Sequence, residues 1–207
     1  MNIDFVNFFN RTDRLNLDIS NRCPLECPHC IRQTQYKNSN IDIPGEDLSL
    51  DSFKKITEFT NAIHFCGQLS DPIHHPMFID FLKICFDKNI DTSIAVASSF
   101  KSLDWFVKAF KANPNANWIF GIDGLPKDSK IYRKHQDGEK LYKVMIESTK
   151  YLNVKPTWQY IVFSYNENDV TFALNLAKEN NINFMIINSA RWDENDKLKP
   201  SKEKSFG

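Results

Sequence analysis

Six short apolar runs alternate along this chain with segments that have the spacing of amphipathic helices. The runs are typical of strands and cover residues 15–19, 62–66, 92–97, 118–122, 158–163 and 184–187. Between them, apolar residues recur at positions i, i+3, i+4 and i+7, and one such set is Phe78, Phe81, Leu82 and Cys85. Such alternation predicts parallel strands that are joined by crossover helices.

The length of the chain limits which parallel architecture can form. A doubly wound sheet and a barrel of βα units both match the alternation. A complete eight-stranded barrel needs about 250 residues, and this chain has 207. We therefore predict an α/β fold, a partial (β/α)6 TIM-like barrel with parallel strands. In either architecture, functional residues lie at the C-terminal ends of the strands.

Composition excludes several classes of protein. The chain is 42% hydrophobic and 25% charged, which is typical of a soluble domain with a core. It has 26 basic and 26 acidic residues, so a nucleic-acid partner is not expected. No apolar run is long enough to cross a membrane, and residues 1–14 lack the features of a signal peptide. We therefore expect a cytoplasmic protein without a membrane partner.

Three of the five cysteines lie in one eight-residue stretch directly after the first strand. Cys23, Cys27 and Cys30 have the spacing C-x3-C-x2-C. In a reducing compartment, such a cluster indicates metal binding or catalysis rather than disulfides. Thiolates are soft ligands that favour zinc, Cu(I) or iron–sulfur centres. A [4Fe–4S] cluster normally takes four cysteines, so three would leave one iron open to a small chelating molecule.

Two other interpretations of the triplet remain open. One is a non-enzymatic zinc-binding module, although zinc-binding cysteine pairs usually come with a second pair, which this sequence lacks. Its fourth ligand would be one of His29, His64, His74 and His75. The other is a set of buried free thiols, which a polar loop disfavours. The two remaining cysteines, Cys66 and Cys85, are expected in the core.

The triplet after the first strand resembles the cysteine motif of the radical S-adenosylmethionine (SAM) family. The resemblance is greatest to its peptide-modifying branch with SPASM-type extensions. It implies an oxidoreductase in which Cys23, Cys27 and Cys30 hold a [4Fe–4S] cluster that binds SAM at the open iron. One electron, delivered by an external flavodoxin- or ferredoxin-like donor, cleaves SAM to methionine and a 5′-deoxyadenosyl radical, which abstracts hydrogen from the substrate.

Segments after the second and third strands also resemble motifs of this family. Residues 67–76 are similar to its Gly-rich segment, in a variant that ends in Asp-Pro and carries Leu69 and Ser70 where glycines are usual. That resemblance implies that this segment binds the amino group of SAM. Small hydroxyl residues after the third strand are expected near its ribose or methionine portion. The expected SAM-binding residues here, with one inside the cysteine motif, are His29, Gln68, Ser70, Asp71 and Ser98.

After the fourth strand, the chain resembles the Ser-x-Asp-Gly segment and following arginine of the peptide-modifying branch. Gly121 stands where the family commonly has serine. The resemblance implies that Asp123 accepts hydrogen bonds from the ribose and that Arg133 pairs with the SAM carboxylate. Without it, Arg133 would be interpreted as a solvated surface charge.

The last two strands contribute three further candidates. Gln159 is a lone amide in an apolar run, and we expect it to contact SAM or substrate if it faces the barrel interior. Arg191 and Trp192, after the sixth strand, are candidate substrate contacts. We predict a core domain over residues 1–192 and a polar tail over 193–207. No cysteine follows Cys85, so the auxiliary-cluster domain of many relatives is expected to be absent.

The resemblance leaves the substrate open between two classes. The segment around Asp123 and Arg133 favours a peptide or protein side chain. The expected lack of a C-terminal extension favours a small molecule, such as a nucleotide or a sugar.

Overall fold

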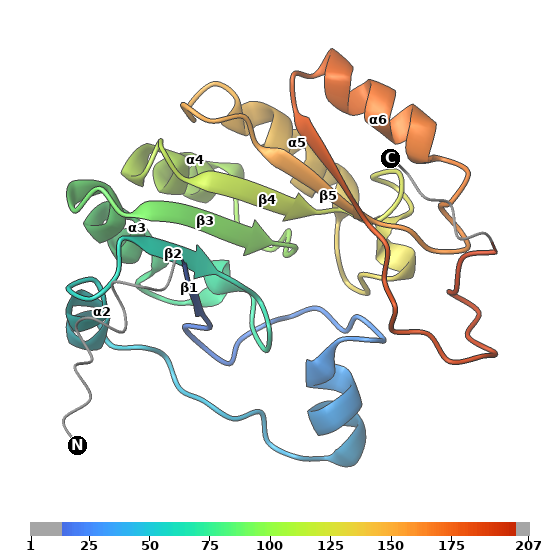
Figure 1. Cartoon of the computed structure of the whole chain (residues 1–207), viewed down its shortest axis with the longest axis horizontal. Coiled ribbons are helices and arrows are strands. Elements are labelled where there is room, and N and C mark those ends of the chain that lie inside the picture. Colours follow the sequence, from blue (N-terminus) through green and yellow to red (C-terminus); the bar gives the residue numbers. More distant parts are fainter. Residues whose placement is uncertain (1–13, 202–207) are drawn as a thin grey trace.

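A computed structural model describes residues 14–201 of the chain. Six strands form one sheet in the order of the sequence, and every neighbouring pair is parallel. They are β1 (Leu15–Leu17), β2 (Ala62–Phe65), β3 (Asp91–Val96), β4 (Asn117–Gly121), β5 (Thr157–Ile161) and β6 (Asn183–Ile187). The predicted α/β partial barrel with parallel strands is confirmed (Figure 1).

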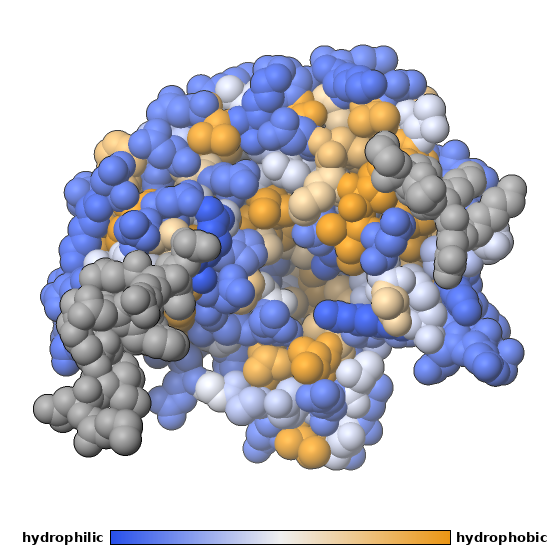
Figure 2. Space-filling model, in the orientation of Figure 1, coloured by the Kyte–Doolittle hydropathy of each residue, from blue (hydrophilic) through white to orange (hydrophobic). Residues whose placement is uncertain are grey.

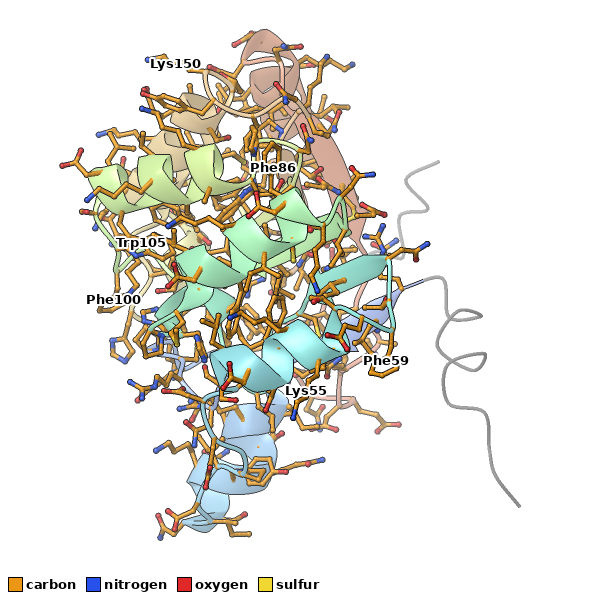
Figure 3. All side chains as sticks on the ribbon, turned by 90° about the vertical axis from the view of Figure 1, so that its left-hand side faces the viewer. Lys55, Phe59, Phe86, Phe100, Trp105 and Lys150 are labelled. Carbon is orange, nitrogen blue, oxygen red and sulfur yellow. The ribbon has the colours of Figure 1, made fainter. Side chains whose placement is uncertain are left out.

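Five α-helices connect the strands and cover one face of the curved sheet. They are α2 (Leu50–Ile56), α3 (Phe78–Asp87), α4 (Leu103–Ala112), α5 (Gly138–Ser148) and α6 (Val170–Glu179). Figure 3 shows α2, α3 and α4 as neighbouring parts of this outer layer. Ser49 and Ser102 cap α2 and α4 by accepting hydrogen bonds from the backbone N–H of Ser52 and Trp105.

The core lies between the sheet and these helices and is rich in aromatic side chains. The rings of Phe53 and Phe81 stack with their centroids 4.2 Å apart, and Phe110 meets Trp118 edge-on at 4.9 Å. All four side chains are fully buried. Cys85 is buried in the same core, as the sequence predicts. Because this layer is tightly packed, it gives the strand ends a fixed spacing.

The connection from β1 to α2 is the longest one and has a different form. It carries the cysteine triplet, a π-helical turn η1 (Arg32–Tyr36) and a 3-10 turn η2 (Lys37–Ser39). In Figure 1 this segment lies below the strands, away from the helical layer. The sequence did not predict these turns. Two further 3-10 turns follow β2 and β4, η3 (Pro72–His74) and η4 (Ser129–Ile131).

Three of the sequence-based expectations concern membrane-spanning helices and the two ends of the chain. Within residues 14–201, no helix has the length and apolar character needed to cross a membrane. The signal-peptide expectation falls on residues 1–14, of which only Arg14 is described. Of the predicted polar tail, residues 202–207 lie outside the described residues. Residues 193–201 pack against the segment between β5 and α6, where the backbone N–H of Ser164 donates to the carbonyl of Leu198.

Replacing Phe81 with alanine tests this account of the core. We expect Phe81→Ala to lower the free energy of unfolding by about 3–5 kcal/mol, because it leaves a cavity against Phe53. Phe172→Ala is the matched control, since Phe172 is 61% exposed on α6, and its effect should stay within about 0.5 kcal/mol. Denaturant unfolding measures both, and equal losses would contradict this description.

Candidate functional site

The three cysteines of the triplet line one small cavity at the C-terminal ends of the strands. This inner cavity has a volume of about 150 Å³. Its wall includes Cys23, Cys27 and Cys30 together with Gly67–Asp71 from the β2 end and Gly121 from the β4 end. All three thiols are free. A turn brings the last two cysteines together, because the backbone N–H of Cys30 donates to the carbonyl of Cys27 at 3.0 Å.

A larger cavity of about 770 Å³ adjoins the inner cavity and opens to the surface. Its wall includes η1 and the ends of β5 and β6, and Figure 2 shows a hollow at the centre of this face. Six residues line both cavities: Cys27, Cys30, Gly67, Gln68, Arg133 and Gln159. The volume lies in the range of ordinary small-molecule sites.

Three cysteine thiols around one cavity are a donor set that could hold a [4Fe–4S] cluster. Among residues 14–201, no three histidine, cysteine, aspartate or glutamate side chains gather tightly enough to hold one metal ion. In a [4Fe–4S] cluster each thiolate binds a different iron, so the cysteines have to surround a cavity rather than meet at a point. Burial raises the pKa of the Cys23 thiol to about 12 and also raises the pKa of Cys27. Metal binding at these thiols would therefore release protons.

The four histidines that were candidate zinc ligands have other partners. His29 pairs with Asp196 at 3.0 Å. His64 contacts the Ser93 hydroxyl through Nδ1, and His74 contacts the Ser98 hydroxyl through Nε2, both at 2.7 Å. His75 Nε2 lies 3.0 Å from the carbonyl oxygen of Leu48. Of the four, His29 lines the larger cavity with Cys27 and Cys30, and His74 lines a separate open hollow with Cys23.

Asp71 joins the cysteine loop to two strand ends. Its carboxylate accepts hydrogen bonds from the backbone N–H groups of Ala97 at 2.8 Å and Ser98 at 2.7 Å. Its own N–H donates to the carbonyl of Arg22 at 2.9 Å. Burial raises the pKa of Asp71, and the backbone donors oppose that rise. The side chain lines the inner cavity, although both of its oxygens already have protein partners.

Ser70 and Ser98 are placed by similar contacts. The hydroxyl of Ser70 donates to Asp18, at the end of β1, and Ser70 lines the inner cavity. Ser98 is fully buried against His74 and lines neither cavity. Ser70 therefore lines the same cavity as the cysteines, whereas Ser98 lies outside the lining of both cavities.

Asp123 and Arg133 pair with each other across the β4 end. Arg133 Nε donates to Asp123 Oδ2 at 2.7 Å, and the other carboxylate oxygen accepts from the N–H of Ile161 at 2.8 Å. Asp123 is fully buried and lines neither cavity, whereas Arg133 lines both. Burial by itself would lower the pKa of Arg133, but Asp123 and Cys27 raise it, so the guanidinium is cationic.

Gly121 has a steric reason to be glycine in this chain. A Cβ at that position would lie 2.8 Å from Nη2 of Arg133, so the guanidinium occupies the space above the strand end. A side chain at residue 121 would therefore require the guanidinium of Arg133 to shift.

The remaining predicted residues lie around the larger cavity. Gln159 faces the barrel interior. Both Gln159 and Gln68 line the two cavities. Arg191 and Trp192 form part of the outer wall. The Trp192 ring meets His29 and Phe163 edge-on, with centroids 5.5 and 5.4 Å apart. Together with the His29–Asp196 pair, these contacts attach the segment after β6 to the cysteine loop.

Three contributors to the site were missed or misplaced by the sequence interpretation. Arg32 lines the inner cavity, and its guanidinium donates to the carbonyls of Asn21 at 2.5 Å and Leu69 at 2.9 Å. Gln136 donates to the carbonyls of Ala97 and Gly121, which ties β3 to β4. The expectation for Cys66 is wrong: its half-buried thiol lines the larger cavity, because the chain leaves the sheet after Phe65.

Comparison with known proteins finds similarity at the level of the fold. No protein-family model matches the chain, and no curated protein matches its sequence. The structure of Streptococcus suis SuiB bound to S-adenosylmethionine superposes with a TM-score of 0.71, at 13% identity over 91% of this chain and 43% of SuiB. SuiB bound to its precursor peptide SuiA gives a TM-score of 0.72, at 12% identity over 95% of this chain and 44% of SuiB.

A second similar structure is methylornithine synthase (PylB), with a TM-score of 0.63 and 10% identity over 90% of this chain and 58% of PylB. At such low identity the likeness concerns the partial barrel. The chain spans less than half the length of SuiB.

The buried pair at the β4 end is a target for mutation. Asp123→Asn leaves a cationic Arg133 whose side chain is only 13% exposed, and we expect a loss of about 3–5 kcal/mol in the free energy of unfolding. Glu147→Gln is the control, because its pair with Lys150 is at the surface and should be worth less than about 1 kcal/mol. Denaturant unfolding of the metal-free chain compares the two, and a small loss for Asp123→Asn would contradict the assigned ion pair.

His74 predicts a pH dependence of stability. Burial, with Lys101 and Arg22 nearby, lowers its pKa from 6.5 to about 4. The unfolded chain therefore binds a proton at His74 more readily than the folded chain does. The contribution of neutral His74 to folding stability is complete above pH 6.5 and is lost as the pH falls towards 4. Between pH 6.5 and pH 4, the unfolding midpoint should fall less in His74→Gln than in the natural chain. An identical fall would show that His74 does not titrate in this way.

Proposed function

We propose that this chain is a radical SAM enzyme. The observation that carries the proposal is the convergence of Cys23, Cys27 and Cys30 on one cavity at the C-terminal end of a partial barrel. The sequence motif and the fold, which the chain shares with a protein solved with SAM, support the same conclusion independently. When bound, the [4Fe–4S] cluster would supply the electron that cleaves SAM to methionine and a 5′-deoxyadenosyl radical.

The residues around the inner cavity would hold SAM in place. Arg133 lines both cavities, and Asp123 positions its guanidinium through Nε. A carboxylate is the natural partner of such a guanidinium. Gln68, Ser70 and Gln159 would add polar contacts, and Asp71 would act mainly by holding the β2 and β3 ends together. Asp123 is then a positioning residue rather than a direct ribose contact.

The larger cavity would receive the substrate. Tyr132, Phe163 and Trp192 give it an apolar wall, and packing of His29 between Tyr132 and Trp192 joins that wall to the cysteine loop. Such a wall excludes water from a reactive centre. A peptide side chain is the first candidate substrate, because SuiB, which has the same fold, was solved with a precursor peptide. A small molecule is the second, because the cavity volume suits one.

Anaerobic reconstitution with iron and sulfide tests the cofactor. We expect a broad iron–sulfur absorption band in the natural chain and its loss in Cys27→Ala. Cys85→Ala is the matched control, since Cys85 is buried in the core and lines neither cavity, and it should keep the band. Stoichiometric zinc without iron would instead favour the zinc-binding module.

The reaction itself is tested with the reconstituted protein. Addition of SAM and dithionite should form 5′-deoxyadenosine, and Arg133→Ala should lower the affinity for SAM because it removes the partner of the SAM carboxylate. No 5′-deoxyadenosine from a fully loaded cluster would contradict the proposal. A short precursor peptide encoded beside the gene would favour the peptide substrate, and neighbouring nucleotide or sugar enzymes would favour the small molecule.

A further inference from the structure

The last strand of the sheet, β6, has a neighbouring strand on one side only. It pairs with β5, and among residues 14–201 no strand pairs with its other side (Figure 1). The N–H of Asn183 and the carbonyl of Ile187 face β5, and each makes a 3.0 Å hydrogen bond to the backbone at one end of that strand. Because the backbone groups alternate in direction along a strand, the N–H and C=O groups of Phe184 and Ile186 point away from β5. They form the free edge of β6.

The free edge lacks the residues that usually protect an edge strand. Between Glu179 and Arg191 the sequence contains no charged residue and no proline, and charges and proline are the common protection of such edges. Asn183 is exposed, and the four apolar residues that follow it in β6 are half-buried. By contrast, β1 at the opposite end of the sheet lies between the charged residues Arg14 and Asp18. An uncharged, apolar edge is a template for another extended segment.

The free edge is continuous with the larger cavity. Phe184 and Ile186 pack on the helical side of the sheet, where the Phe184 ring meets that of Trp158 edge-on at 5.4 Å. Ile187 has the opposite orientation and lines the larger cavity. Side chains that lie directly opposite each other on neighbouring strands share a face of the sheet. A residue of an added strand that lies opposite Ile187 would therefore point into the larger cavity.

We propose that an extended, apolar segment of a peptide substrate adds to the free edge of β6 as a further strand. The inference rests on the proposed function and refines its first candidate substrate. Backbone hydrogen bonds to Phe184 and Ile186 supply the affinity, and alternate side chains of the peptide pack beside these two residues on the helical side. The residue opposite Ile187 enters the larger cavity, whose wall includes Cys27 and Cys30. This continuity favours a substrate over a second copy of the chain, because only the substrate has to reach the cysteines.

The test uses the full chain and a short fluorescent peptide of alternating valine and threonine residues, with binding measured by fluorescence anisotropy. Ile186→Pro removes an N–H from the free edge but no hydrogen bond to β5, so the sheet can keep its pairing. It should weaken peptide binding by about tenfold. Ile186→Val is the matched control, since it keeps the N–H and should bind within about twofold of the natural chain. Unfolding midpoints check that both variants fold.

A second pair of probes leaves the protein unchanged. The peptide is N-methylated either on every valine or on every threonine, and in a paired strand only one of these two sets has its N–H groups facing β6. One isomer should therefore bind about tenfold more weakly than the parent peptide, and the other should bind as the parent does.

Three results would overturn the proposal: equal binding of both methylated isomers, no binding of the parent peptide, or unchanged binding by a folded Ile186→Pro variant. A dimer that Ile186→Pro breaks, in a chain that does not bind the peptide, would assign the free edge to a second copy. Peptide binding at the edge without formation of 5′-deoxyadenosine by the cluster-loaded chain would support the edge and contradict the proposed function.

Discussion

The carboxylate of Asp71 is the contact on which the geometry of the site depends. It accepts hydrogen bonds from the backbone after β3, while its own N–H binds the carbonyl of Arg22, one residue before the triplet. One residue, through its carboxylate and its backbone N–H, thus joins the cysteine loop to the ends of β2 and β3. Such a buried carboxylate is stable only when its partners satisfy it, so the loop and the strands have to be in place together.

The pair of Asp123 and Arg133 holds the end of β4 in a similar way, through a buried carboxylate with protein partners. Asp123 is buried behind the wall, and its charge holds a guanidinium in front of it. Gly121 leaves the space that this guanidinium needs. Asp123 therefore lies behind Arg133 and outside both cavities, whereas Asp71 lines the inner cavity while its oxygens bond to the backbone.

The strands could be predicted from the sequence because hydrophobic periodicity is local: all six begin within one residue of the predicted starts. The sequence left open whether Gln159 faces the barrel interior, because an apolar run does not by itself show which of its side chains point inward. Pairings between distant residues could not be predicted, since no short pattern encodes them. The contact of Arg32 with Leu69 and that of Gln136 with Ala97 are of this kind. The position of Cys66 was misjudged because a strand that ends one residue earlier moves its side chain from the core to the cavity.

The outer wall of the larger cavity comes after the last strand and is not part of the sheet. Residues 188–192 form it, and contacts of Trp192 and Asp196 with the cysteine loop hold it in place. Insertions or replacements in this segment would alter the size of the opening without breaking any hydrogen bond between strands. Evolution and protein engineering can therefore change which molecules fit the larger cavity by changing this one segment, while the inner cavity stays as it is.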